Sequence, residues 1–286
     1  MKIGFVGAGK VGFALGKYAK GQGINLSGYV SRSSGSAKEA AGFVGTAHFA
    51  SLSEVLAASD LLFLSVPDGE IAPVWRELKT LPLAGKRICH LSGSLSSAVF
   101  DEIERTGADG FSLHPFFAVS SKFDSHKELH RAFFTLEGSG ASLSEIKALI
   151  EGMGNPVYII EPGQKILYHT AAVFLSNHVA ALAQIGCKLL EDCGFEEAAQ
   201  LAALQTLFLG HCQKIAAAGP IKSLTGPVER GDAQTVKGHL GCLPGPEKQL
   251  YARLSETLTQ MARDKHPGRD YTAIEALIGQ TMEEYK

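Results

Sequence analysis

The sequence predicts an α/β domain with a mostly parallel, doubly wound sheet, followed by an all-α domain. In the first half of the chain, short apolar runs alternate with helical stretches, which is typical of a parallel sheet flanked by helices. In the second half, apolar residues recur at helical spacing and only loops separate the segments. With 286 residues, the chain has enough material for two domains of ordinary size.

The predicted strands of the first half are short. We expect them at 2–6, 25–30, 60–67, 87–93, 110–116 and 133–138, with helices at 11–21, 36–42 and 53–58 between the early ones. The run 60–67 is almost continuously apolar, as expected of a strand that is covered on both faces. Ser53 is the predicted N-cap of the third helix.

The second half begins with a predicted helix of more than five turns within 161–194, which ends near Gly194 as a C-cap glycine. Leu167, Ala171, Phe174 and Asn177 lie on one stripe of this helix, and its many alanines allow another helix to pack closely. Further helices are predicted near 196–217, 233–240, 247–263 and 270–285. We therefore predict domains at 1–157 and 158–286.

The composition is that of a soluble globular protein, with 45% apolar and 20% charged residues. A net charge of -2 predicts no attraction to nucleic acid or to an anionic membrane. No apolar run approaches the roughly 20 residues that span a bilayer, and we expect neither a signal peptide nor a membrane segment. The five cysteines are scattered and never spaced as CxxC, which favours reduced thiols in the cytoplasm.

Residues 7–12 read GAGKVG, a GxGxxG pattern that follows a strand and opens a helix. In such a turn Gly7 makes the bend, Gly9 lets a pyrophosphate approach the backbone, and Gly12 lets helix and strand pack closely. The helix N-terminus offers unpaired N–H groups to the phosphates. The pattern predicts a dinucleotide-binding Rossmann domain in which residues 7 and 9–12 (Gly7, Gly9, Lys10, Val11 and Gly12) bind the cofactor. The alternative is a merely structural turn.

The second strand ends in Ser31-Arg32-Ser33, where a site that prefers NAD usually carries an acidic residue. No carboxylate is present there to repel a 2′-phosphate, and Arg32 can donate paired hydrogen bonds to it. The sequence therefore predicts NADP(H) and not NAD(H). The alternative is that Arg32 points into solvent.

Two further strand ends lie at the carboxyl edge of the predicted sheet, where ligands bind in open α/β folds. We expect both to flank the nicotinamide ribose, unless they are ordinary capped turns. Their residues are Ser65, Val66 and Pro67 after one strand, and Ser92 and Gly93 after the next.

The glycine motif, the SRS and SVPD strand ends and the long helix together resemble the superfamily of 6-phosphogluconate, β-hydroxyacid, ketopantoate and pyrroline-5-carboxylate reductases. More narrowly, LYHTAAVFLSNHVAAL and LTGPVERGD resemble a bacterial family of NADP oxidoreductases that carry the domain of unknown function 2520. The resemblance spans nearly the whole chain. It implies a Rossmann domain and a helical domain that forms a homodimer, and it implies no particular substrate.

The long helix carries candidate catalytic side chains. Lys165 and His169 are spaced i, i+4 and share a face, and Asn177 lies close to the same stripe. In β-hydroxyacid dehydrogenases a lysine and an asparagine four residues later lie near the start of a similar helix. Lys165 matches that lysine, but His169 stands in the asparagine's place, which argues against a β-hydroxyacid substrate. The alternatives are a solvated Lys165 and a hydrogen-bonded core histidine at 169.

His114-Pro115 follows a strand and resembles the HP pair of prephenate dehydrogenases, in which the histidine lies at the active site. A histidine there can transfer protons near neutral pH, or can simply cap backbone groups. In the loop 225–232, Asp232 is a predicted N-cap. Arg230 in the same loop either grips an acidic substrate or forms a surface ion pair.

These observations predict a cytoplasmic NADP(H)-dependent oxidoreductase that transfers hydride to or from a small carbonyl, hydroxy-acid or imine substrate. Its predicted catalytic residues are Lys165, His169, Asn177 and His114. We expect a homodimer and no metal, because the metal motif HExxH and dense carboxylate clusters are absent, although His114, His169 and His178 could converge. The alternatives are a non-catalytic NADP(H)-binding sensor, and an enzyme that uses a second cofactor such as a deazaflavin.

Overall fold

The computed structural model describes residues 1–285, apart from the side chain of Ser139. Contacts divide the chain into two compact units, Met1–Asn177 and His178–Lys286. The predicted division after residue 157 falls inside the last strand of the sheet, so this strand and the helix after it pack with the first unit.

The first unit is built on one eight-stranded sheet in the order β3-β2-β1-β4-β5-β6-β7-β8. Every neighbouring pair is parallel except β6–β7, which is antiparallel, so the predicted mostly parallel sheet is confirmed. The strands are β1 (Ile3–Val6), β2 (Leu26–Val30), β3 (Ala47–His48), β4 (Leu61–Leu64), β5 (Arg87–His90), β6 (Asp109–Pro115), β7 (Phe134–Ser139) and β8 (Val157–Ile159).

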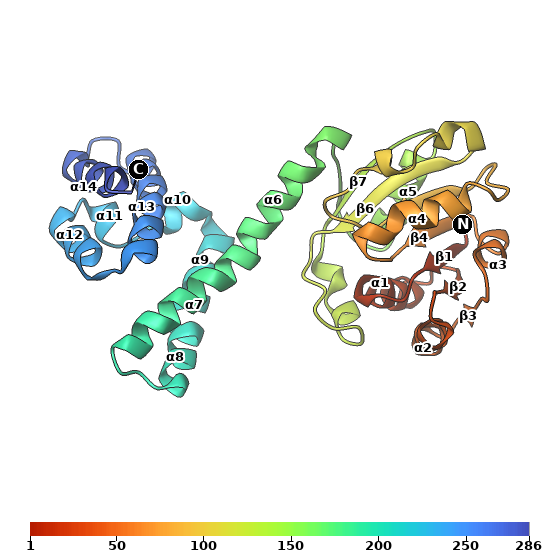
Figure 1. Ribbon diagram of the computed structural model, residues 1–286, viewed down its shortest axis with the longest axis horizontal. Coiled ribbons are helices and arrows are strands. Elements are labelled where there is room, and N and C mark those ends of the chain that lie inside the picture. Colours follow the sequence, from red (N-terminus) through yellow and green to blue (C-terminus); the bar gives the residue numbers. More distant parts are fainter. Residues whose placement is uncertain (286) are drawn as a thin grey trace. The chain divides into compact units, whose positions relative to one another are not determined.

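Helices cover both faces of this sheet. On one face, α1 (Lys10–Gly21), α2 (Ser34–Val44) and α5 (Leu143–Glu151) share a core with Phe5, Phe63 and Phe111. On the other face, α3 (Leu52–Ala57) and α4 (Asp68–Leu78) pack with Leu62 and Ile88. Figure 1 shows this sheet with helices α1, α2 and α4 beside it. Apolar side chains therefore alternate between the two faces along each strand, as the near-continuous apolar runs require.

One predicted cap was wrong. The backbone N–H of Glu54 donates to the Oγ atom of Ser51 at 3.2 Å, so Ser51 and not Ser53 is the N-cap of α3. The helix begins at Leu52, which places Ser53 inside its first turn, where its hydroxyl is not at the capping position.

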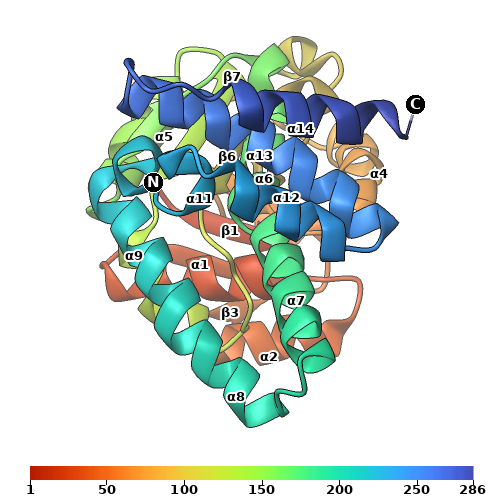
Figure 2. The same ribbon diagram turned by 90° about the vertical axis from the view of Figure 1, so that its left-hand side faces the viewer.

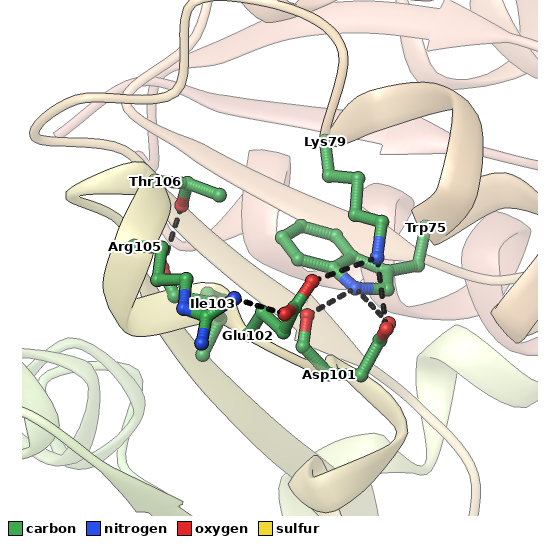
Figure 3. A network of polar contacts seen from close by, with 7 residues as sticks. All are labelled: Trp75, Lys79, Asp101, Glu102, Ile103, Arg105 and Thr106. Atoms are coloured by element: carbon green, nitrogen blue, oxygen red, sulfur yellow. Dashed lines mark hydrogen bonds and ion pairs between the residues drawn. The ribbon is translucent and has the colours of Figure 1, made fainter.

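The connection from β5 to β6 is fixed to α4 by polar contacts (Figure 3). The indole N–H of Trp75 donates to the carbonyl oxygen of Asp101 at 3.1 Å and to its carboxylate at 2.9 Å. The ammonium of Lys79 lies 2.8 Å from the same carboxylate and holds the pKa of Asp101 below its usual value. These contacts secure the segment that carries the predicted Ser92–Gly93 strand end.

The second unit is helical. Its helices are α7 (Asn177–Asp192, which begins at the last residue of the first unit), α8 (Glu197–Ala203), α9 (Leu209–Ala218), α10 (Pro220–Ser223), α11 (Pro227–Arg230), α12 (Ala233–Cys242), α13 (Gly245–Lys265) and α14 (Thr272–Glu283), with a π-helical turn at Leu204–Phe208. Helices α12, α13 and α14 lie together (Figure 2) around Val236, Ala252 and Ile274. The predicted loop 219–232 therefore contains two short helices.

The predicted single helix within 161–194 is two helices, because the backbone leaves the helical conformation at Ser176. α6 (Lys165–Leu175) ends there, and the Ser176 hydroxyl donates to the carbonyl oxygen of Ala172 at 2.6 Å, a bond that competes with the backbone ladder. Gly194 has a φ of +87°, which suits the predicted helix end.

The segment Pro162–Asp192 contains an apolar stretch that was not predicted. By length and composition alone, Pro162–Asp192 is long and apolar enough to cross a membrane, and none of its most apolar part is buried. Leu167 and Leu175, for example, are 74% and 71% exposed. Isolated polar residues interrupt this segment, so the sequence shows no long continuous apolar run. Its mean hydropathy of 1.3 is nevertheless high enough for a membrane-spanning helix.

Candidate functional site

The glycine motif forms the floor of a cavity of about 690 Å³ at the carboxyl edge of the sheet. Gly7 has a φ of +97°, a conformation that favours glycine, and α1 begins directly after Gly9. Of the predicted cofactor residues, the cavity is lined by Gly7, Gly9, Ser31, Arg32, Ser33, Ser65, Val66 and Pro67. The structure thus gathers three predicted strand ends at one cavity.

The glycines and the start of α1 give this cavity features that suit a dinucleotide. A side chain at Gly7 would place its Cβ 2.7 Å from Val66, and one at Gly9 would lie 3.1 Å from the carbonyl oxygen of Ser65, so both glycines keep the cradle open. The first turn of α1 holds no acidic residue that would repel phosphates. Lys10, Val11 and Gly12 do not line the cavity but form this first turn, whose free N–H groups lie at the helix start.

A carboxylate at the outer end of this cavity was not foreseen. The side chain of Arg32 is 90% exposed, and its guanidinium lies 3.7 Å from the carboxylate of Glu70 on α4. Ser36, in the first turn of α2, lines the same end. Arg32 is therefore free to turn toward a ligand, because an exposed ion pair of this length contributes little.

A band of polar side chains crosses the sheet next to this cavity. Register pairs His90 with Ser112, Ser112 with Glu137, and His114 with Thr135, so all five side chains lie on one face of β5, β6 and β7. Four of them are buried and His114 is half-buried. Because buried polar groups cost free energy in an apolar core, such a band marks a site and not ordinary packing.

Helix α6 supplies three side chains to this band. The ammonium of Lys165 is 1% exposed and donates to the carbonyl oxygen of Ser92 at 3.0 Å. The hydroxyl of Tyr168 lies 2.8 Å from Nδ1 of His114. The rings of His114 and His169 stand edge to face, with centroids 6.4 Å apart. Three of the four predicted catalytic residues, Lys165, His169 and His114, are therefore brought together.

Gly93 lies against this histidine pair. A Cβ at Gly93 would lie 2.8 Å from Nδ1 of His169 and 2.9 Å from Nε2 of His114, so only glycine lets both rings approach the loop. Nδ1 of His169 is buried and, among the described residues, has no hydrogen-bond partner. An unpaired buried nitrogen of this kind is available to a ligand.

Burial controls the protonation of the band. It lowers the pKa of Lys165 to about 8, against the opposing charge of the Glu137 carboxylate. Burial, together with the charge of Lys165, lowers the pKa of His114 to about 4, and burial lowers that of His90 to a similar value. At neutral pH both histidines are therefore uncharged, whereas Lys165 is mostly protonated and titrates just above neutrality.

Asp68 connects the band to the cavity. It follows Pro67, which lines the cavity, and its carboxylate accepts hydrogen bonds from the hydroxyls of Ser92 at 2.8 Å and Ser94 at 2.9 Å. The Ser92 hydroxyl in turn accepts from the backbone N–H groups of residues 94 and 95. Ser92 and Gly93, predicted to contact the cofactor, thus lie between the cavity and Lys165.

Other predicted residues lie elsewhere. Asn177 stands two turns beyond His169, exposed, where its side-chain oxygen accepts from the Ser176 hydroxyl at 3.1 Å; the structure does not bring it to Lys165. His178 belongs to the second unit, and Arg230 is exposed at the end of α11 there. Asp232 accepts from the N–H of Thr235 at 3.0 Å, which confirms it as the N-cap of α12.

Glu137 and His90 were not predicted as site residues, whereas Asp68 and Tyr168 were noted at the SVPD strand end and on the long helix without an assigned role. Glu137 is the one acidic residue in the apolar strand FFTLEG, and His90 interrupts RICHLSG in the same way. An isolated polar residue in a strand covered on both faces indicates a candidate functional residue, because its side chain cannot reach solvent.

Comparisons with known proteins agree with this architecture. Residues 1–115 match the model of a Rossmann-like domain, and residues 132–258 match DUF2520, a domain of unknown function. This pairing confirms the resemblance that the motifs predicted. None of the curated proteins matches the chain.

Three solved structures are similar over nearly the whole chain. Protein TM1727 from Thermotoga maritima is 27% identical, with a TM-score of 0.73 and coverage of 92% of this chain and 99% of that one. The "putative NADP oxidoreductase BF3122" from Bacteroides fragilis is 23% identical, with a TM-score of 0.69 and coverage of 91% and 98%. An imine reductase from Aspergillus terreus, in complex with NADPH4 and dibenz[c,e]azepine, is 18% identical, with a TM-score of 0.63 and coverage of 96% and 98%. The last two, below 25% identity, show a shared fold.

Proposed function

We propose that this chain, which joins a Rossmann-like domain to the domain of unknown function 2520, is an NADP(H)-dependent oxidoreductase acting on a small carbonyl, hydroxy-acid or imine substrate. One observation carries the proposal. A buried lysine with a pKa near 8 and a pair of histidines lie beside the cavity that Gly7 and Gly9 line, joined to it through Asp68. A lysine whose pKa is strongly lowered beside a cleft is typical of a catalytic site.

When bound, NADPH would supply the hydride. The chain's contribution to holding it comes from the first turn of α1 for the pyrophosphate and from Arg32 and Ser33 for the 2′-phosphate. The loop with Ser92 and Gly93 faces the reacting end, because it lies between the cavity and Lys165. A preference for NADP(H) over NAD(H) is supported by Arg32 and by the absence of an acidic residue at the end of β2; Glu70 of α4, 3.7 Å from Arg32, is the carboxylate that a 2′-phosphate would displace.

Lys165 is the proposed proton donor. Reduction of a carbonyl needs one proton at the product oxygen, and an ammonium with a pKa near 8 both holds that proton at neutral pH and releases it readily. In the reverse direction the neutral amine takes the proton back. His114, uncharged and fixed by Tyr168, would orient the substrate by a hydrogen bond from its ring.

The exposed apolar helices support a homodimer in this proposal. No residue of α7, α8 or α9 is buried, and Leu201 and Leu207 are 53% and 78% exposed. A second copy would cover such a face, because monomers rarely leave large contiguous apolar patches in water. We place the protein in the cytoplasm on its scattered free cysteines.

The test is consumption of NADPH at 340 nm with three probes: dibenz[c,e]azepine, cyclohexanone with methylamine, and cyclohexanone alone, with 3-hydroxybutyrate and NADP⁺ for the reverse reaction. We expect turnover with one of them, and a loss of about 10²-fold or more in Lys165→Met. Lys20→Met, at the exposed end of α1, is the matched control and should keep full activity. No binding of NADPH, or equal turnover in both variants, would overturn the proposal.

A further inference from the structure

Two oppositely charged side chains are sealed inside the first unit. Among the described residues, Glu137 and Lys165 are the only aspartate, glutamate, lysine or arginine side chains that are buried, at 0% and 1% exposure. Both lie at the polar band, one on β7 and the other on α6. A single buried charge is very costly, whereas two of opposite sign offset each other, so their shared location needs a common explanation.

Glu137 is held in place without a direct ion pair. Its carboxylate accepts hydrogen bonds from the backbone N–H of Ser97 at 2.8 Å and from the Ser97 hydroxyl at 2.5 Å. Ser97 opens a short 3-10 turn in the connection that also carries Ser92. These two donors hold the carboxylate at a fixed position. No ion pair within 4 Å joins Glu137 to any cation among residues 1–285, so Lys165 stays free to meet a ligand.

The other titratable groups around Lys165 cannot replace this charge. They are Cys89 and His90 on β5, His114 on β6, Asp68 at the start of α4, and Tyr168 and His169 on α6 itself. Burial keeps the Cys89 thiol protonated by raising its pKa, and it keeps His90 and His114 uncharged at neutral pH. Asp68 is exposed, so solvent screens its charge. Glu137 is the buried carboxylate whose opposing effect on Lys165 is largest.

We propose that Glu137 is a positioning residue for Lys165: its buried carboxylate, fixed by Ser97, keeps the lysine in the ammonium form that can donate a proton to a substrate. The proposal extends the proposed function, because it assigns the group that keeps the proton donor charged. Without Glu137, burial would lower the pKa of Lys165 with less opposition, so a smaller share of the lysine would be in the ammonium form.

The titration of Lys165 can be measured directly and without substrate. Protein labelled with 13Cε-lysine gives one resonance per lysine, and the resonance missing from Lys165→Arg identifies Lys165. Its midpoint is expected near pH 8 in the wild type. In Glu137→Gln, which keeps an acceptor for Ser97 but removes the charge, we expect it about one pH unit or more lower.

Two controls frame this experiment. Asp68→Asn removes an exposed carboxylate from the same site and should shift the Lys165 midpoint less than Glu137→Gln does. The resonance of Lys79, which pairs with Asp101 on the surface, should stay where it is in all variants. An unchanged Lys165 midpoint in Glu137→Gln, or an equal shift in Asp68→Asn, would overturn the proposal.

Thermal melting gives a second test if Glu137→Gln folds poorly. If the two buried charges compensate each other, the double variant Glu137→Gln/Lys165→Met should melt above Glu137→Gln alone, because the uncompensated ammonium is gone. Additive losses would refute the coupling. Both measurements are independent of turnover, so a coupled Lys165 in a protein that turns over no probe would refute the proposed function and leave this inference standing.

Discussion

Replacing Arg32 by alanine should convert a preference for NADPH into indifference between the two nicotinamide cofactors. Among the described residues that line the cavity, Arg32 is the one cation, and it lies at the strand end where a 2′-phosphate is expected. NADH lacks that phosphate, so its affinity should not depend on Arg32. The change therefore acts on a difference between two ligands and not on the fold.

The expected loss of NADPH affinity is the free energy of the contact from Arg32 to the 2′-phosphate minus that of the ion pair that Arg32 breaks to make it. A charge-assisted contact from guanidinium to phosphate contributes about 1.5–3 kcal/mol. Binding releases the ion pair with Glu70, which at 3.7 Å and with both side chains largely exposed contributes at most about 1 kcal/mol. The remainder, about 0.5–2 kcal/mol, corresponds to a Kd for NADPH about 2–30 times higher in Arg32→Ala.

Isothermal titration calorimetry with NADPH and NADH, at low salt and again at 0.5 M salt, measures this directly. Salt should shrink the NADPH preference of the wild type, because the contact is exposed and screened. Glu70→Gln is the matched control: it removes the carboxylate that competes for Arg32 and should tighten NADPH binding by a few-fold. Equal weakening of both cofactors in Arg32→Ala would refute the reasoning, since it would place Arg32 away from the 2′-phosphate.

Three further outcomes are expected. Gly93→Ala forces the rings of His114 and His169 to move by about 0.5 Å to reach an ordinary contact of 3.4 Å, so turnover should fall about tenfold while calorimetry shows unchanged NADPH binding. In the folded protein the pKa values of His90 and His114 are near 4, below the ordinary 6.5, so the unfolded chain binds more protons between these values and stability is lost as the pH falls. Urea unfolding should show that the free energy of unfolding drops by about 2 kcal/mol per histidine by pH 5. His90→Gln should halve this pH-dependent loss. Leu207→Glu should yield monomers by light scattering if a second copy covers the helices, and should change nothing if that face is free.

The sheet could be predicted because its strands carry their own pattern. The run 60–67 is too apolar for any half-exposed strand and ends in residues that line the cavity. The run 87–93 has apolar residues at 88, 89 and 91 and ends in serine and glycine. The antiparallel orientation of β7 could not be predicted, because the apolar pattern of FFTLEG does not depend on the direction of the strand. Only the pairing with β6 sets that direction. The break at Ser176 was also hidden, since serine is tolerated within helices.

The candidate site was only half visible in the sequence. The cavity residues follow a motif with fixed spacing, so Gly7, Gly9 and Arg32 could be assigned from the sequence alone. Lys165 and His114 were both predicted, but the position of Glu137 beside them could not be, because Glu137 and His114 come from neighbouring strands whose antiparallel register sets them on one face. Asn177 shared a helical stripe with His169 in projection, but two helical turns separate them along the axis, a rise of about 12 Å.

The buried charges of the band are best explained by chemistry and not by stability. A sheet face across β5, β6 and β7 filled with leucine and valine would be at least as stable, because replacing a buried ion pair by apolar residues is often neutral or favourable. The rest of that face follows this rule, with Phe100 and Ile103 packed over Gly110. The polar side chains begin where α6 and the Ser92 loop meet the sheet, next to the cavity that the glycines keep open. A fold that accepts this cost at one edge of one cavity holds a buried lysine beside that cavity, which is where the proposed oxidoreductase would need a proton donor.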